Sequence, residues 1–459
     1  MSILGTLGSS SRAIDDAAHV ARVVGMHAHR LEGAPHDFDP ILELAAGTRW
    51  VLLGEASHGT HDFYRVRAEI TKRLITEFGF SAVAVEADWP DAFRVNRYVR
   101  GEAGDADADE ALAGFTRFPQ WMWRNADVLD FVGWLRAHNE ALPPSAARVG
   151  FYGLDLYSMH ASMAHVLAYL DVVDPEAAHR ARARYACFDH FGEDPQEYGF
   201  AVSRGMSESC EREVVEQLVE MQRTAGEWAV RDGKLAPDAH FFAQQNARLV
   251  RNAEAYYRAM FRGGAASWNV RDRHMFETLN QLGEHLRAGT RAPARVVVWA
   301  HNSHLGNAAA TEMARHGELN LGQLVRHAYG TDALLVGFST YAGTVTAASD
   351  WGGPAQRMAV RPGLRGSYEA LLHDVGGRLL LDLRRSLELR RVLDEPRLQR
   401  AIGVIYRPQT ERMSHYFETR LPEQFDCLLH YDTTRAVEPL ERTGLWEGGE
   451  LPATYPTAL

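Results

Sequence analysis

The sequence is poor in cysteine, with three residues, Cys187, Cys210 and Cys427, among 459. Their odd number and wide spacing argue against a disulfide framework and against a zinc site built from cysteines. No apolar run approaches the roughly 20 residues that cross a bilayer. Residues 1–12 contain neither the basic segment nor the apolar core of a signal peptide. We therefore expect a soluble cytoplasmic protein with no membrane partner.

Clustered basic residues are also missing. The chain carries 49 basic and 60 acidic side chains, a formal net charge of −11, whereas nucleic-acid-binding proteins concentrate lysine and arginine on one surface. We therefore expect no nucleic-acid partner. A hydrophobic content of 46% and ten tryptophans are enough for a sizeable core, so the protein should be globular.

Two groups of catalytic signatures are absent as well. The chain has no G-x-S-x-G nucleophile elbow, which argues against a covalent acyl-enzyme. It also lacks the H-E-x-x-H and H-x-x-x-H spacings, so a metal site is the weaker of the two uses for its histidines. These absences favour a reaction in which an activated water is the nucleophile.

What the chain does contain is a series of strand-like runs that end in acidic residues or histidine. A buried-strand pattern at 50–53 is followed by Glu55 and His58 and then by a helical pattern at 63–78. Three further strand patterns end in the same residue types: 81–86 in Glu86 and Asp88, 148–154 in Asp155, and 294–300 in His301 and His304. In an open parallel sheet, the carboxyl ends of the strands meet along one crevice, where ligands bind. We therefore predict that these side chains surround one pocket, with His58 and His301 within about 10 Å of each other.

The whole pattern predicts an α/β fold with a mainly parallel central sheet flanked by helices. Long helical patterns replace strand patterns between about 158 and 262. We interpret this stretch as a helical insertion that covers the carboxyl edge of the sheet and carries substrate selectivity, within a single domain of residues 1–459. The segment 101–114 is typical of an exposed acidic loop. Later strand patterns lie at 333–338, with 344–348 pairing beside it, and at 376–381, 402–406 and 425–431.

The residue types at the strand ends suit hydrolysis. Histidine is a natural general base near neutral pH, and a neighbouring carboxylate fixes its tautomer and raises its basicity. A second histidine or an arginine would stabilise the oxyanion that develops on a carbonyl. Two other interpretations use the same residues: Glu55, His58, Glu86 and His301 could ligate a divalent ion, or Glu55 and His58 could merely cap the helix that follows them.

An aromatic cluster lies at 118–125, with the sequence FPQWMWRN. Such a cluster usually belongs to the core, but it can also wall a pocket for an apolar ligand. We expect Trp121 or Trp123 to form an apolar wall of the predicted pocket.

Five segments together resemble the erythromycin esterase family. They are GEASHGTHDFYRVRAEI at 54–70, VAVEADWP at 83–90, RFPQWMWRN at 117–125, SWNVRDRHM at 267–275 and VVVWAHNSH at 296–304. The resemblance implies an ester hydrolase that needs no cofactor and no metal, with catalytic roles for Glu55, His58, Glu86 and His301. Together with the strand-end pattern, it leads us to expect contacts with a small-molecule ester or lactone from five further residues: Arg67, Trp123, Asp155, Arg271 and His304.

In the resistance enzymes of this family, the target is a macrolide lactone. The segment 406–440 resembles a branch that is widespread in bacteria and need not share that substrate. Two interpretations from other classes stay open beside hydrolysis. One is a metal- or haem-iron-binding protein of related fold, and the other is a binding protein without catalysis. The intact set of histidines and glutamates argues against the second, since a binding module has no need for it.

Overall fold

A nine-stranded sheet forms the centre of the protein, which the computed structural model describes over residues 18–192, 194–224, 237–288 and 293–448. The strand order is β1-β8-β11-β6-β2-β5-β3-β4, and β7 pairs with β6 outside this path. The strands from β11 to β4 are parallel, whereas β1, β8 and β7 join antiparallel. Their bounds are β1 His29–Arg30, β2 Trp50–Leu53, β3 Ala82–Asp88, β4 Gly150–Asp155, β5 Val296–Trp299, β6 Ala333–Ala347, β7 Gln356–Val360, β8 Arg378–Asp382 and β11 Cys427–Thr434. The predicted α/β fold with a mainly parallel sheet is confirmed.

The two faces of the sheet bury two separate apolar cores. Side chains alternate along a strand, so Trp50 and Leu52 of β2 enter one core while Val51 and Leu53 enter the other. All four are buried, as expected of a parallel strand covered on both faces. The continuous apolar run that indicated a strand in the sequence is therefore the consequence of helices on both sides.

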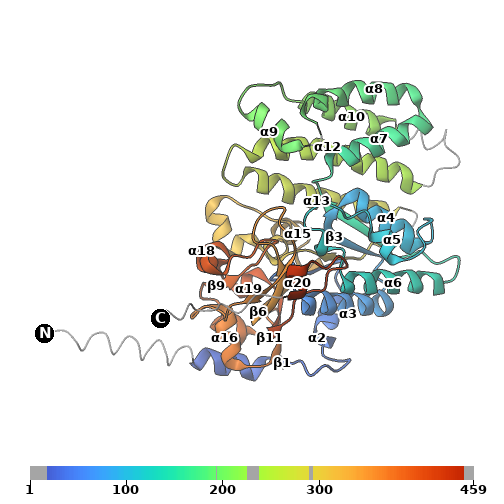
Figure 1. The fold of residues 1–459 in the computed structure, drawn as a ribbon. Helices are drawn as coiled ribbons and strands as arrows, with labels where there is room; N and C mark the ends of the chain where they lie inside the picture. Colours follow the sequence, from blue (N-terminus) through green and yellow to red (C-terminus); the bar gives the residue numbers. More distant parts are fainter. Residues whose placement is uncertain (1–17, 193, 225–236, 289–292, 449–459) are drawn as a thin grey trace.

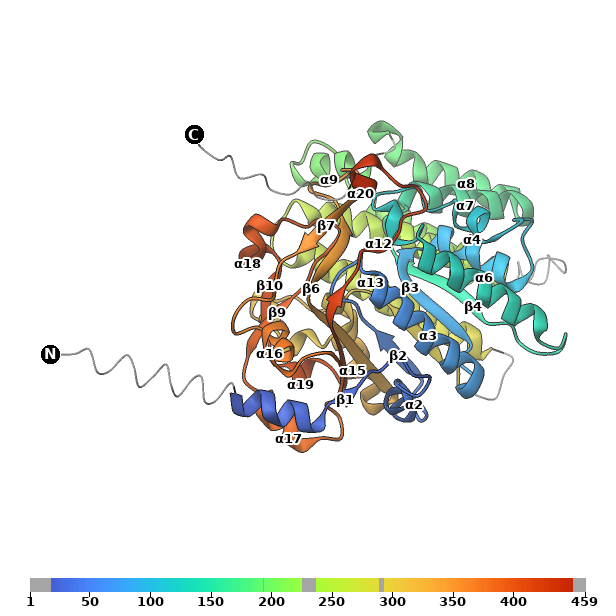
Figure 2. The ribbon, with the colours of Figure 1, turned by 60° about the horizontal axis from the view of Figure 1, so that its bottom comes forward.

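One face is covered by α2 Asp39–Ala45, α3 His61–Phe78, α5 Ala108–Leu112 and α6 Ala126–Ala141. Figure 2 looks onto this side, with α3 and α6 lying across the strands. The opposite face is covered by α13 Ala266–Arg287 and α15 Leu321–Tyr329. The helix α4 Trp89–Arg100 contributes to both cores, because Trp89 and Phe93 face one of them and Val95 and Val99 the other.

A block of helices stands on the α13 side of the sheet (Figure 1). It consists of α7 Met159–Val173, α8 Pro175–Tyr185, α9 Pro195–Ser203, α10 Glu211–Arg223 and α12 Pro237–Met260. Its helices pack on one another, and α12 joins the block to α13 and α4. The apolar side chains of the block are continuous with the core on that face of the sheet.

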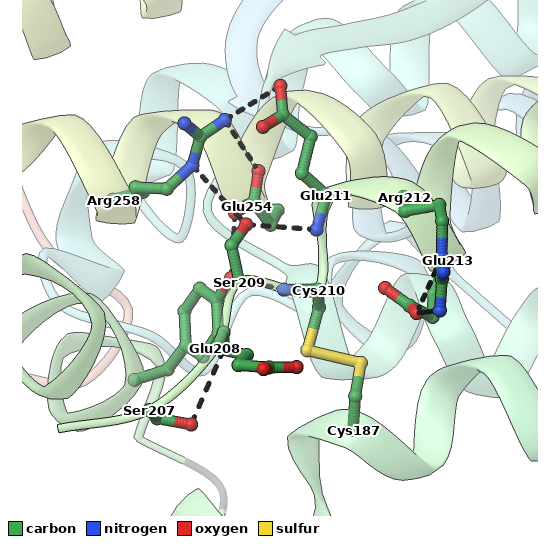
Figure 3. The surroundings of a disulfide bond; sticks show 11 residues. Cys187, Ser207, Glu208, Ser209, Cys210, Glu211, Arg212, Glu213, Glu254 and Arg258 are labelled. Atoms are coloured by element: carbon green, nitrogen blue, oxygen red, sulfur yellow. Dashed lines mark hydrogen bonds and ion pairs between the residues drawn. A yellow bond between two sulfur atoms is a disulfide. The ribbon is translucent and has the colours of Figure 1, made fainter. Parts of the chain in front are cut away.

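A disulfide links Cys187 and Cys210 within this block, contrary to the expectation from the spacing of the cysteines (Figure 3). The two residues are 23 positions apart, but α10 packs against α8, which brings their Cα atoms to 6.0 Å. Cys427 is a buried free thiol. The spacing argument is wrong here because contact between helices, rather than distance along the chain, decides whether two cysteines meet.

Three other expectations from the sequence are corrected. The strand patterns at 333–338 and 344–348 belong to one long strand, β6, and β7 is its antiparallel partner. The segment 402–406 makes isolated bridges but no strand. The predicted loop 101–114 contains α5, since Ala111 and Leu112 are buried while the acidic residues remain outside.

The remaining elements follow β5 in the chain. They are α14 Asn302–Leu305, α16 Tyr368–Val375, α17 Leu387–Val392, α18 Glu411–Ser414, α19 Leu421–Gln424 and α20 Gly444–Gly448, with β9 Arg397–Arg400 and β10 Tyr416–Thr419 forming a small antiparallel sheet. None of the helices in the described ranges has the length and apolar character that crossing a membrane requires.

Candidate active site

The register of the central strands brings three of the predicted residues to one edge of the sheet. Trp299 of β5 pairs with Leu53 of β2 on one side and with Val85 of β3 on the other. Glu55, Glu86 and His301 lie one or two residues beyond these positions, so they leave the sheet side by side. Because the strands are parallel, this is the carboxyl edge that the sequence predicted.

Two glycines allow the turn between β2 and α3 to fit closely against its neighbours. A Cβ atom on Gly54 would lie 2.2 Å from Oδ1 of Asn302, and one on Gly59 would lie 1.8 Å from the backbone oxygen of Thr346. The turn is also braced by the segment that follows β9, because the N–H of Ile402 donates to the oxygen of Ala56 at 2.8 Å. The turn is thus held by packing from several elements.

His58 is oriented by Glu55 within the same turn. Its Nδ1 lies 2.8 Å from Oε1 of Glu55, and both side chains are buried. The second oxygen of Glu55 forms an ion pair with Arg67 at 2.7 Å. Since Nδ1–H donates to this carboxylate, the neutral ring carries its lone pair on Nε2. Nε2 makes no hydrogen bond within the part of the chain that the structure describes, and His58 lines the cavity described below.

Arg67 lies behind this pair, out of contact with the cavity, so the structure does not support the predicted contact with substrate. Its side chain is fully buried and packs over the rings of Tyr64 and Trp299. It does not line the cavity, and neither does Glu55. The family resemblance marked Arg67 as a site residue, but it could not show that Glu55 and His58 stand between Arg67 and the cavity.

Glu86 lies at the centre of a buried network. Oε1 accepts a hydrogen bond from Nη2 of Arg271 at 2.7 Å, and Oε2 accepts one from the N–H of His301 at 2.8 Å. Burial would raise the pKa of Glu86, but the nearby His304, His58 and Arg271 outweigh it and lower that pKa below its ordinary value. Glu86 is therefore a carboxylate at neutral pH and places a negative charge beside His58 and His304.

Arg271 is shared between two carboxylates. It donates from Nε and Nη2 to the two oxygens of Asp155, at 2.9 and 2.6 Å, in addition to its bond with Glu86. Burial would raise the pKa of Asp155, but Arg271 outweighs it and lowers the pKa. Both residues line the cavity, as predicted, but their charges are already paired with each other.

His301 has the opposite tautomer to His58. The N–H of Ser303 donates to Nδ1 at 3.2 Å, and the Ser303 hydroxyl lies 2.8 Å from the same atom. An Nδ1 that accepts a hydrogen bond places the proton of the neutral ring on Nε2. Burial, and then the nearby His58, hold the pKa of His301 well below its ordinary value, so the ring is neutral at pH 7. Nε2 is buried and makes no well-aligned hydrogen bond among the described residues, although the backbone of Ala56 lies close enough to oppose the lowering of the pKa.

His304 is held in place by a residue that the sequence did not single out. Asp272 accepts a hydrogen bond from its Nδ1 at 2.9 Å, Nη1 of Arg271 donates to its Nε2 at 2.9 Å, and Trp268 stacks on the ring at 4.5 Å. Burial would lower the pKa of His304, but Asp272 and Glu86 outweigh it and raise the pKa. Asp272 stands next to Arg271 in the motif at 267–275, and this position could have identified it as a site residue from the sequence.

One cavity of about 390 Å³, a size suited to a small organic ligand, lies among these residues, although Glu55, Arg67 and Asp272 do not line it. His58 and His301 face each other there, with ring centroids 4.9 Å apart and an interplanar angle of 43°. The predicted proximity is confirmed. The other predicted residues that line the cavity are Glu86, Asp88, Trp123, Asp155, Arg271 and His304.

The roof of the cavity differs from the prediction. No described residue of the helical block lines it, and the block reaches the wall from its outer side, where Tyr256 and Tyr257 contact Tyr157. The block packs over α13 because its apolar surface continues the core on that face. The covering residues are instead Phe115, Arg117, Phe118, Pro119, Met122, Trp351, Ala401, Gly403 and Val404. Phe115, Trp351 and Ala401 had no sequence signal, whereas the residues between 117 and 122 belong to the motif at 117–125, and Gly403 and Val404 belong to the segment 402–406 that was predicted as a strand.

The geometry gives no direct support to a metal site. Among the described residues, no group of three or more histidine, cysteine, aspartate or glutamate side chains is arranged to hold a metal ion. The carboxylates of Glu55 and Glu86 are directed to Arg67 and Arg271, respectively.

Solved structures similar to this one share its fold. A succinoglycan biosynthesis protein has a TM-score of 0.74, at 18% identity over 92% of this chain and 98% of that chain. A protein from Bacillus cereus has a TM-score of 0.75, at 19% identity over 93% and 99%. A mutant of the erythromycin esterase EreC in its open conformation has a TM-score of 0.63, at 18% identity over 90% and 98%.

Two curated proteins are similar in sequence. Erythromycin esterase type II of Escherichia coli is 22% identical over 68% of this chain and 73% of its own length. The putative hydrolase YbfO of Bacillus subtilis (strain 168) is 22% identical over 80% of this chain and 82% of its own length. The family model for erythromycin esterase matches residues 75–434, a range that includes Glu86 and His301 but not Glu55 or His58. Because this match spans well over half of the chain, the protein belongs to the erythromycin esterase family.

Proposed function

We propose that the protein is a hydrolase that cleaves a carboxylic ester or lactone with water activated by His58. Membership of the erythromycin esterase family points to a hydrolase. The observation that carries the proposal is the complementary pair of imidazoles. Both rings line one cavity with their centroids 4.9 Å apart, and their Nδ1 contacts leave a lone pair on Nε2 of His58 and a proton on Nε2 of His301.

The reaction follows from these two tautomers. Nε2 of His58 takes a proton from a water molecule as the oxygen of that water attacks the carbonyl carbon of the ester. The carbonyl oxygen becomes an oxyanion, which accepts a hydrogen bond from Nε2–H of His301. When the intermediate collapses, the imidazolium of His58 gives its proton to the alkoxide that leaves. The products are a carboxylic acid and an alcohol, or one hydroxy acid from a lactone.

The buried carboxylates support the charge changes in this sequence. Glu55 lies on the far side of the His58 ring, where its negative charge stabilises the imidazolium. Glu86 fixes the backbone of His301 through the bond to its N–H. The two roles of the histidines therefore depend on residues that reach the same cavity edge from β2, β3 and β5.

The substrate proposed first is a macrolide lactone, because the Escherichia coli relative is named an erythromycin esterase. Simple carboxylic esters form the second class. The cavity volume of about 390 Å³ lies toward the small end of ligand pockets, so a large lactone would bind with part of its surface exposed to solvent.

The test is a hydrolysis assay on a panel of macrolide lactones and simple esters, with and without a chelator. The wild-type protein should hydrolyse at least one compound, at a rate that the chelator leaves unchanged. His58→Ala should lower turnover by about 10²–10⁴-fold, while His327→Ala, which removes an exposed histidine of α15, should not. Full activity in His58→Ala would refute the mechanism, and loss of activity with chelator, restored by a divalent ion, would favour a metal-dependent hydrolase instead.

A further inference from the structure

The turn that carries His58 is hydrogen-bonded to the chain just after β9, at segment 401–404. The N–H of Ile402 donates to the oxygen of Ala56 at 2.8 Å, and the N–H of His58 donates to the oxygen of Ile402 at 3.3 Å. Ile402 therefore pairs with the turn on both sides of Ser57, as a residue of a parallel strand would. The other residues of the segment line the cavity: Ala401, Gly403 and Val404. The position of His58 thus depends on where segment 401–404 lies.

Segment 401–404 follows Arg400, the last residue of β9, whose side chain is 1% exposed. Nε donates to the hydroxyl of Tyr416 at 2.9 Å, Nη1 to the oxygen of Tyr341 at 3.1 Å and Nη2 to the oxygen of Arg361 at 2.7 Å. The counterion is Glu411 of α18, which is 3.1 Å away and 3% exposed. The guanidinium therefore joins β6, β10, α18 and the chain after β7 to the residue at which the segment begins.

Other hydrogen bonds hold the chain on either side of this segment. The N–H of Ala401 donates to the oxygen of His415 at 2.8 Å, and the N–H of Arg407 donates to Nε2 of the same histidine at 3.1 Å. The hydroxyl of Tyr406 donates to Oε1 of Glu411 at 2.9 Å. These partners of segment 401–404 belong to the sequence segment 406–440, which the proposed mechanism does not use.

We propose that Arg400 is a positioning residue for His58. By fixing segment 401–404, it places the turn so that His58 can take a proton from a water molecule in the cavity. The inference rests on the proposed function, because it takes His58 as the general base. Buried ion pairs often add little net stability, but they can select one arrangement of the chain. A general base needs such an arrangement, since a misplacement of about 1 Å can cost about 10²-fold in rate.

A purely stabilising role of Arg400 makes a different prediction. Removing the guanidinium would then lower the free energy of unfolding and leave the kcat of the folded molecules unchanged. A positioning role instead lowers kcat and weakens the two hydrogen bonds between His58, Ile402 and Ala56. The backbone N–H groups of His58 and Ile402 report this contact through their exchange with solvent deuterium, which requires no substrate.

The main variant is Arg400→Met/Glu411→Gln, which removes both charges so that neither is left buried alone. On the best ester of the panel, its kcat should fall by about 10–10²-fold. Arg400→Lys keeps a positive charge beside Glu411 and should recover most of that loss. The matched control is Arg315→Met/Glu418→Gln, the same substitutions at an ion pair whose side chains are 68% and 46% exposed. It should have the kcat of the wild type.

Hydrogen–deuterium exchange of the same full-length proteins is followed by mass spectrometry. Uptake should increase in the peptides that contain His58 and Ile402 in Arg400→Met/Glu411→Gln, and it should stay at the wild-type level in the control. If the double variant does not fold, Tyr406→Phe is measured in its place. That change removes one hydroxyl that donates to Glu411, and it should change uptake and kcat in the same directions by smaller amounts.

Unchanged deuterium uptake at His58 and Ile402 would overturn the inference, as would a normal kcat in the variant that folds. Failure of the proposed function would show itself differently. The wild type would then hydrolyse no compound of the panel, while the uptake of the turn would still respond to Arg400. In that case the placement of the turn by Arg400 stands, and the role of His58 as a base falls.

Discussion

The rings of His58 and His301 lie 4.9 Å apart, although one follows β2 and the other follows β5. Glu55 fixes the first ring through Nδ1, and Ser303 fixes the second through Nδ1 in the opposite sense. Nε2 is therefore an acceptor on one ring and a donor on the other, and both rings line the same cavity. A pair of histidines that merely satisfied their own turns would have no reason to present opposite tautomers to a shared space.

Replacing His301 should reduce catalysis without preventing binding. His301→Phe keeps a ring but removes the Nε2–H donor, so kcat should fall by about 10²–10³-fold with little change in KM. Ser303→Ala removes the hydroxyl and keeps the backbone N–H that sets the tautomer, and its effect should be much smaller. Steady-state kinetics on the best ester of the panel provides the measurement. A His301→Phe enzyme with normal kcat would remove His301 from the oxyanion role.

Glu55 should act on catalysis through His58. Glu55→Gln keeps an oxygen that can accept from Nδ1–H but loses the negative charge opposite the imidazolium, and an amide rotated to present its NH₂ group would favour the wrong tautomer. We expect kcat to fall by about 10²-fold or more, with the pH profile of kcat/KM displaced. Glu69→Gln, at an exposed ion pair on α3, is the matched control and should behave as wild type. Equal kinetics in the two variants would contradict the orienting role.

The site residues at the strand ends could be predicted from the sequence, because each one follows its own strand directly along the chain. A buried parallel strand appears as a continuous apolar run, and Glu55, Glu86, Asp155 and His301 follow such runs directly. The parallel topology then brings them to one edge without further information.

The cavity roof and the position of the helical block could not be predicted in this way. Trp351 reaches the cavity from a loop that leaves no periodic pattern, and Gly403 reaches it from a segment whose apolar pattern predicted a strand that does not form. Helical periodicity in 158–262 indicated helices correctly, but it does not specify which surface they cover. The same limit applies to the contact between Cys187 and Cys210, which depends on how α10 packs on α8.

Arg67 should matter for stability and for the position of Glu55, but not for substrate affinity. Arg67→Met keeps much of the side-chain volume and leaves the buried Glu55 carboxylate without its counterion. The free energy of unfolding should fall by about 3–5 kcal/mol, as is typical when one partner of a buried pair is removed. Urea unfolding and KM measured on the same variant test both statements. A large increase in KM at unchanged stability would restore the substrate-contact role.

Glu86 should make stability depend on pH in the acidic range. Its folded-state pKa lies below the ordinary value of 4.5, so the ionised group stabilises the fold above that value and the stabilisation is lost as the pH falls through the folded-state pKa. Glu86→Gln should therefore be less stable than wild type at neutral pH, by about 3 kcal/mol, and the difference should shrink under acidic conditions. Urea unfolding at a series of pH values gives the comparison. Glu69→Gln should show a difference below about 1 kcal/mol throughout, because that carboxylate is 42% exposed.

The disulfide should stabilise the helical block without affecting catalysis. Cys187 and Cys210 close a loop across 23 positions, for which the chain-entropy model gives a stabilisation of about 3 kcal/mol. The block does not line the cavity, and it contacts Tyr157 through α12. The double variant Cys187→Ala/Cys210→Ala should therefore unfold at a lower temperature and retain kcat and KM. Adding a thiol reductant should lower the unfolding temperature of the wild type and leave that of the double variant unchanged, which controls for other effects of the reductant. If kcat instead falls when the disulfide is removed, the helical block influences the cavity, and the contact with Tyr157 is the route.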